Sequence, residues 1–229
     1  MLTNKQNHFT ISSCPRPSPG ILVIGGDSGN GDGSPATRSV EFWSASDPEG
    51  SCVLEDYPRE MEHGPTVNLV SGQLVACYGD TCDTFKDGEW NHLVETRSAR
   101  KYSSSAVNDH RMLLLGGGEF EGPFSNTTEW IPVDGSPAQP GPFNVNVEFG
   151  CVIQTAPDLI VVTGGSPNGS SNGQMSQDVW EYQLTGDFTK TPLTPMRQGR
   201  LGHACGVYQG VGGQQVNHCE LYNFNLIRS

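Results

Sequence analysis

Four short apolar segments, each closing in glycine, are the most regular feature of the hydrophobic pattern. Ile, Val and Leu dominate them, and each is too short for a helix, which favours buried β-strands. The closing glycines predict places where the backbone turns sharply or approaches another strand, because glycine adopts positive φ without steric cost. The segments are ILVIGG from Ile21, LVACYG from Leu74, MLLLGG from Met112 and IVVTGG from Ile160.

The segments recur along the chain. Their last glycines, Gly26, Gly79, Gly117 and Gly165, are 53, 38 and 48 residues apart. Self-similarity with a period of this size is typical of propellers and solenoids. Further candidate strands lie before the second, third and fourth segments and once more near the end of the chain. They are TVNLV from Thr66, SSSAV from Ser103, GCVIQT from Gly150 and HACGVY from His203.

Other residues follow the same period. Each closing glycine is followed, after a loop of variable length, by one of the four tryptophans, and similar basic stretches begin at Arg97 (RSARKY) and Arg197 (RQGRLGH). Asp87-Gly88, between TCDTF and EWNHL, predicts a tight hairpin. The pattern therefore indicates four short strands in each unit.

An apolar run closing in Gly-Gly, a variable loop, a Trp and a basic residue before the next strand resembles the Kelch repeat. Kelch repeats are four-stranded antiparallel blades arranged radially as a β-propeller. The resemblance covers residues 9–208, although the second unit has Tyr78-Gly79 in place of the doublet. The residues that carry it are Gly25, Gly26, Gly79, Gly116, Gly117, Gly164, Gly165, Trp43, Trp90, Trp130 and Trp180.

The resemblance implies an all-β fold, a Kelch-type β-propeller of about four four-stranded antiparallel blades in an incomplete ring. The units span 9–56, 57–96, 97–143 and 144–195, with a partial fifth from 197 and an aberrant tail at 209–229. Kelch propellers usually close with five to seven blades, so we expect this chain to be a fragment, a truncated isoform or a misjoined product. An open arc exposes the apolar faces of its end blades.

The predicted strands can be stated residue by residue. They are 9–13, 21–25, 39–43 and 52–54 in the first unit and 66–70, 74–78, 81–85 and 89–93 in the second. They are 104–107, 112–116, 127–132 and a poorly marked strand before Phe143 in the third, then 151–154, 159–164, 178–183 and 191–193 in the fourth, with 204–208 opening the fifth.

Charge and composition narrow the functional classes. The net charge of −12 repels polyphosphate and anionic membrane surfaces, so we expect no nucleic-acid partner. No apolar run exceeds five residues, far short of a membrane span.

The seven cysteines favour disulfides over a metal site, because no two close pairs have zinc-ligand spacing. We interpret Cys77 and Cys82 as a disulfide across a hairpin rather than as half of a metal site, because a second pair of ligands is missing. Glycosylation triplets begin at Asn126 and Asn168, and with the cysteines they favour a secreted, extracellular protein. The first twenty residues lack the apolar core of a signal peptide, which leaves two alternatives: a cytoplasmic protein, or a product of a longer secreted parent.

No catalytic residue, metal ligand or cofactor site is assigned. The six histidines have no HExxH or paired spacing, and GSSNG from Gly169 matches the nucleophile-elbow letters inside a small-residue loop. DSGNGDG from Asp27 has clustered oxygen ligands but lacks the terminal Glu of a calcium loop. A copper-dependent propeller oxidoreductase, similar to galactose oxidase, is the enzymatic alternative, although its ligands cannot be placed here.

The leading interpretation is a non-catalytic scaffold that binds a protein partner through the loops connecting its blades. The acidic chain favours a neutral or basic partner surface. An intracellular substrate-binding module of a ubiquitin ligase is a further alternative, although no BTB-like or F-box-like segment is present. The loops are 27–38, 119–126 and 166–177, with Asp27, Asp32, Phe120, Phe124 and Asn168 as binding candidates.

Overall fold

The structure, a computed structural model, describes residues 20–27, 36–44, 51–61, 64–118, 125–145, 149–166, 175–203, 205–209 and 215–218. These residues form antiparallel β-sheets, as predicted, and no helix occurs among them. The first sheet is β1 (Gly20–Asp27), β2 (Ala36–Ser44) and β3 (Ser51–Val53), and the second is β4 (Thr66–Val70), β5 (Gln73–Lys86) and β6 (Glu89–Arg100). The third is β7 (Ser104–Asn108), β8 (Arg111–Leu115), β9 (Thr127–Pro132) and β10 (Gln139–Asn144); the fourth is β11 (Cys151–Ala156), β12 (Leu159–Thr163), β13 (Val179–Gln183) and β14 (Lys190–Pro192). The last is β15 (Gly206–Gln209) with β16 (Gln215–His218).

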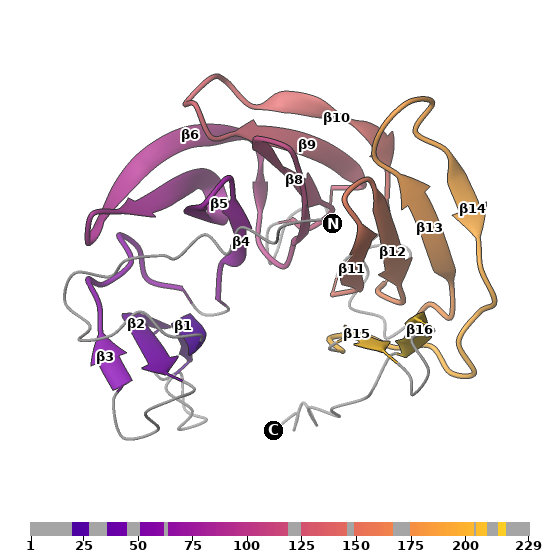
Figure 1. The fold of residues 1–229 in the computed structure, drawn as a ribbon. Helices are drawn as coiled ribbons and strands as arrows, with labels where there is room; N and C mark the ends of the chain where they lie inside the picture. Colours follow the sequence, from indigo (N-terminus) through magenta and orange to yellow (C-terminus); the bar gives the residue numbers. More distant parts are fainter. Residues whose placement is uncertain are drawn as a thin grey trace, which may run out of the picture.

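The sheets follow one another along an arc (Figure 1). Neighbouring first strands lie side by side on the inner side of the arc, β4 against β7, β7 against β11 and β11 against β15. The last strands, such as β10 and β14, lie on the outer side (Figure 1). The arc is open between the first sheet and β15–β16, and no described sheet continues into the next through a hydrogen-bonded strand edge.

The second sheet has four extended segments, because β5 folds back on itself. The Cα atoms of Cys77 and Cys82 are 4.0 Å apart, whereas five residues of a straight strand span about 17 Å. Thr84 Oγ1 also donates a hydrogen bond to Leu74 O across the same hairpin, at 3.0 Å. The next turn, at Asp87-Gly88, has positive φ at both residues (55° and 93°), which is the geometry of the predicted tight hairpin.

Most predicted strands in the second to fourth units overlap observed ones, and β9 has the predicted bounds of 127–132. Two differences concern weakly marked strands. The strand expected before Phe143 includes it, since β10 is Gln139–Asn144; its two prolines are tolerated because β10 is an edge strand. β16 was not expected within the tail. The strand predicted at 9–13 lies outside the described residues.

The cores lie between successive sheets. Each inner sheet buries both of its faces, which is why its strands read as continuous apolar runs rather than as an alternation. Ile24 and Val40 pack on Ala76 and Phe85 between the first and second sheets. Val75 and Cys77 pack on Met112, Leu114 and Ile131 between the second and third. Leu113, Leu115 and Trp130 pack on Ile160, Val162 and Tyr182 between the third and fourth.

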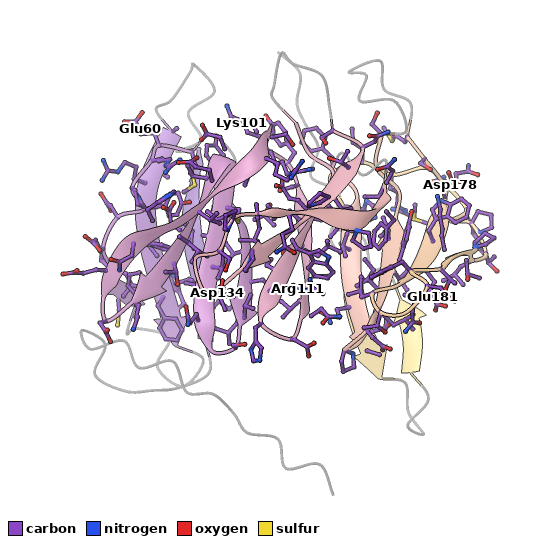
Figure 2. The ribbon with its side chains drawn as sticks, turned by 90° about the horizontal axis from the view of Figure 1, so that it is seen from above. Glu60, Lys101, Arg111, Asp134, Asp178 and Glu181 are labelled. Atoms are coloured by element: carbon purple, nitrogen blue, oxygen red, sulfur yellow. A yellow bond between two sulfur atoms is a disulfide. The ribbon has the colours of Figure 1, made fainter. Side chains whose placement is uncertain are left out.

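The arc has two distinct edges (Figure 2). The glycine positions and the segments that lead to the next sheet lie at one edge, near Glu60 and Lys101, and the turns that precede β8 and follow β9 lie at the other, near Arg111 and Asp134. The close backbone approach predicted for the glycines is present at some of these positions: a Cβ on Gly117, whose φ is 79°, would lie 2.6 Å from Lys101 O, and one on Gly164 would lie 2.7 Å from Arg200 O. A Cβ on Gly26 or Gly79 would have no atom within 4 Å, so at these two positions the positive φ alone favours glycine.

Candidate binding site

A cavity of about 440 Å³ opens at the turn edge of the arc, where β4, β7 and β11 come together. Because first strands of three successive sheets contribute to it, the cavity is a product of how the sheets are arranged around the inner side of the arc. Its lining residues are Asn68, Leu69, Val107, Asn108, Asp109, Gln154, Pro157, Asp158 and Thr185.

Two matching turns fix one wall of the cavity. Ser71, after β4, and Asp109, after β7, both have left-handed backbone angles, with φ of 50° and 51°. Ser71 Oγ donates to Asp109 O at 3.2 Å and lies 2.6 Å from His110 Nδ1. These contacts tie the turn of the second sheet to the turn of the third, so Asp109 is held in place at the rim.

Gln154 lines the cavity between the third and fourth sheets. Its side-chain amide makes both hydrogen bonds of a strand partner to Val107: Oε1 accepts from Val107 N at 3.0 Å and Nε2 donates to Val107 O at 2.6 Å. Nε2 also donates to Pro157 O at 3.0 Å. With its amide fully engaged, Gln154 positions the surrounding groups and presents little unsatisfied polarity of its own.

The cavity is acidic. Asp109 and Asp158 line it together with three side-chain amides, and no Lys, Arg or His is among the lining residues. Asp158 Oδ2 accepts from Gln183 Nε2 at 2.6 Å, and Thr185 Oγ1 lies 3.5 Å away, so this carboxylate is oriented by its neighbours. An acceptor-rich site of this kind suits a cationic or amide donor group.

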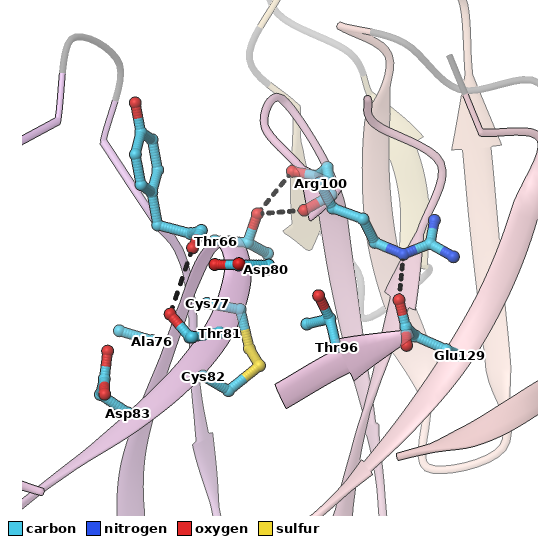
Figure 3. The surroundings of a disulfide bond; sticks show 12 residues. Thr66, Ala76, Cys77, Asp80, Thr81, Cys82, Asp83, Thr96, Arg100 and Glu129 are labelled. Atoms are coloured by element: carbon cyan, nitrogen blue, oxygen red, sulfur yellow. Dashed lines mark hydrogen bonds and ion pairs between the residues drawn. A yellow bond between two sulfur atoms is a disulfide. The ribbon is translucent and has the colours of Figure 1, made fainter. Parts of the chain in front are cut away.

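Two further acidic side chains are buried between sheets, where they serve structure. Glu129 (β9) and Arg100 (the end of β6) form an ion pair in which the side chains are 1% and 2% exposed (Figure 3). Arg100 Nη1 also donates to Gly116 O at 2.6 Å and to Thr127 O at 2.9 Å, and Arg97 N donates to Glu129 Oε2 at 2.8 Å. The second and third sheets are therefore linked by a fully bonded charge network.

Asp83 has the corresponding role between the first and second sheets. Its side chain is 2% exposed and its Oδ2 accepts a 2.8 Å hydrogen bond from Tyr57 Oη. Burial, reinforced by the Asp83 charge, raises the pKa of the Tyr57 phenol well above its usual range. Arg59 and His92 lie 3.9 and 3.8 Å from Asp83 Oδ1. In both buried sites the donor comes from the segment preceding the acid's own sheet.

Every glycine of the predicted repeat has positive φ, between 61° and 117°. The tryptophans do not share one position: Trp43, Trp130 and Trp180 lie in the strand after the loop, whereas Trp90 lies in β6. Trp130 is buried and Trp43 is 44% exposed.

The predicted loop candidates are only partly described. Asp27 is the last residue of β1, and Asn126, a glycosylation candidate, is exposed immediately before β9. The other predicted loop residues, Asp32, Phe120, Phe124 and Asn168, lie outside the described residues.

The disulfide predicted between Cys77 and Cys82 is present, and Cys52 is also disulfide-bonded. A second pair, Cys151–Cys205, was not predicted. The signal was available: both cysteines lie in the candidate first strands of consecutive units, and first strands are neighbours along the arc. In the part of the chain that the structure describes, no three His, Cys, Asp or Glu residues form a group that could hold a metal ion. No described helix is long and apolar enough to cross a membrane.

A scan of protein-family models finds none that matches this chain, and a search of curated proteins finds no matching sequence.

Proposed function

We propose that this protein is a Kelch-type β-propeller scaffold, present here as an open arc of blades, that binds a protein partner without catalysing a reaction. The recurring glycine positions, the inner placement of the first strands and the radial order of the sheets support the propeller interpretation. Cysteine pairs in two parts of the arc fit an oxidising compartment, which supports the secreted alternative.

The observation that carries the binding proposal is the acidic cavity at the turn edge. It collects Asp109 and Asp158 with the amides of three strands in one concave site, and its lining contains no cation. We propose that it receives an Arg or Lys side chain of the partner, for which carboxylates and amide oxygens are the natural acceptors.

A ligand titration tests the cavity. The probes are the blocked tripeptides Gly-Arg-Gly, Gly-Lys-Gly and Gly-Glu-Gly, followed by NMR through the side-chain amides of Asn108 and Gln154. We expect the two basic peptides to shift these signals at roughly millimolar concentration, the range for one side-chain contact, and the acidic peptide to leave them unchanged. Added salt should weaken the shifts.

A protein carrying both Asp109→Asn and Asp158→Asn should no longer show the shifts. Asp187→Asn, at an exposed turn after β13, is the control and should still show them. No response to any basic peptide at roughly 10 mM, well above that range, would contradict the proposal. An equal response in the doubly substituted protein would contradict it too.

A further inference from the structure

One face of the first sheet is apolar and open to solvent. Ile21 and Val23 of β1 are 69% and 47% exposed, and Trp43 of β2, which pairs with Ile21, is 44% exposed. Val53 of β3, which lies on the same face, is 73% exposed. The opposite face of this sheet is packed against the second sheet, so among the described residues only one face is without a neighbouring sheet.

The same positions are buried in the second, third and fourth sheets. Counting back from the closing glycine of each repeat, the counterparts of Val23 are Ala76, Leu114 and Val162, which are at most 2% exposed. The counterparts of Trp43, opposite the first residue of each apolar run, are Phe85, Ile131 and Tyr182, also at most 2% exposed. In each of those sheets the covering surface is the preceding sheet.

Glu41 extends this equivalence to charge. It pairs with Val23, as Glu129 pairs with Leu114, and Asp83 lies opposite Ala76 in the β5 hairpin. Glu129 and Asp83 each accept a hydrogen bond from a side chain in the segment before their sheet, Arg100 and Tyr57 respectively. Among the described residues, the Glu41 carboxylate has neither a hydrogen bond nor an ion pair.

The other end of the arc holds the complementary group. Arg100 pairs with Gly79, the closing glycine of the second repeat, and Arg200 O accepts from Gly165 N, the closing glycine of the fourth, at 2.9 Å. Arg200 is therefore the counterpart of Arg100. Within the described part of the chain its guanidinium has no acidic partner.

The fourth sheet also has apolar residues free to contribute on that side. Val179 of β13 and Leu193 just after β14 are joined by a 2.9 Å backbone hydrogen bond and are partly exposed. Their face is opposite to the one that packs on the third sheet through Trp180 and Tyr182. One end of the arc thus carries an apolar surface with the acid Glu41. The other carries Val179 and Leu193 with the base Arg200, beside Glu181 on the same face of β13.

We propose that two copies of this chain associate head to tail, with the first sheet of one copy packed on the end of the arc that the fourth sheet and β15–β16 form in the other, and Glu41 paired with Arg200. A face-to-face pair of first sheets would bring two Glu41 side chains together, so charge favours the head-to-tail arrangement. A contact between two different surfaces forms a closed ring or extends to longer assemblies. The inference is independent of the acidic cavity.

Sedimentation velocity of the full chain at concentrations from roughly 1 to 100 μM, the range of transient association, tests the proposal. We expect a concentration-dependent dimer or longer assembly. Glu41→Arg and Arg200→Glu should each weaken association at least about tenfold, the effect of breaking a close interfacial charge pair. The protein carrying both changes should recover association to within about threefold of the unaltered chain, because the pair is restored with its signs exchanged.

Asp187→Arg, with the same charge change as Glu41→Arg at an exposed turn, is the control and should associate normally. Circular dichroism and thermal unfolding check that each variant is folded. A chain that stays monomeric at the highest concentration would overturn the proposal. An assembly that is insensitive to both single reversals, or a double reversal without recovery, would equally overturn it.

Discussion

The buried ion pair between Arg100 and Glu129 gives the sharpest test of what holds successive sheets together. Replacing Arg100 by Met keeps the length of the side chain and removes its charge. Glu129 would then remain 1% exposed with the Arg97 amide as its single described donor, and the carbonyls of Gly116 and Thr127 would lose their bonds to the guanidinium. An uncompensated buried charge of this kind costs about 3–5 kcal/mol of unfolding free energy.

The expected loss is large enough to measure without ambiguity. For a chain of 229 residues, about 3–5 kcal/mol corresponds to a fall in Tm of roughly 6–20 °C. Urea unfolding should be followed by circular dichroism and tryptophan fluorescence together, since coincident transitions license a single free energy. Arg97→Met is the matched control: Arg97 contacts Glu129 through its backbone N–H, which the substitution keeps.

A double-substituted protein separates the charge from the packing. Arg100→Met with Glu129→Leu removes both buried charges, so it should be more stable than Arg100→Met alone by at least about 2 kcal/mol. Two results would refute the reasoning. One is an Arg100→Met protein within about 1 kcal/mol of the unaltered chain. The other is a double variant less stable than Arg100→Met, because the carboxylate would then not be the source of the cost.

Three further predictions concern other links between elements. Changing Cys151 and Cys205 to Ser should lower the free energy of urea unfolding by about 4 kcal/mol, because this disulfide closes a loop of 54 residues. Changing Cys77 and Cys82 to Ser should lower it by about 2 kcal/mol, because that loop has 5 residues. Equal losses from the two changes would contradict this prediction. Burial and the nearby Arg200 lower the pKa of His203 below 6.5, so protonation favours the unfolded chain and stability should fall as pH drops below about 6.5. His203→Gln should flatten this part of the pH–stability curve, and an unchanged slope would exclude His203 as its source. Tyr57→Phe should cost about 1–3 kcal/mol by removing the hydrogen bond to buried Asp83, and unfolding by urea with an unchanged midpoint would contradict that.

The sequence was sufficient to locate most strands and several of the turns between them. Runs such as MLLLGG from Met112 are apolar without alternation because both faces of the strand are covered, and the glycine marks the residue where φ becomes positive. Asp87-Gly88 and the Cys77–Cys82 pair are equally local, since each depends on residues at most five apart. β10 and β16 were less visible because they contain prolines or polar residues.

Tertiary structure alone decided the long-range polar contacts. Arg100 and Glu129 are 29 residues apart and belong to neighbouring sheets, and neither looks different in sequence from an exposed charged residue. The acidic cavity has the same origin: Asp109 and Asp158 are turn residues of different sheets, brought together because first strands share the inner side of the arc.

The first and third apolar runs show most clearly what the local sequence determines and what the tertiary structure decides. Val23 and Leu114 occupy the same place in ILVIGG and MLLLGG, yet Val23 is 47% exposed and Leu114 is fully buried. Local sequence determines that both residues lie in a strand and on the same kind of face. Whether that face is buried depends on a neighbouring sheet, because apolar side chains are removed from water only when a second surface packs on them, and the sequence of one strand does not determine that second surface.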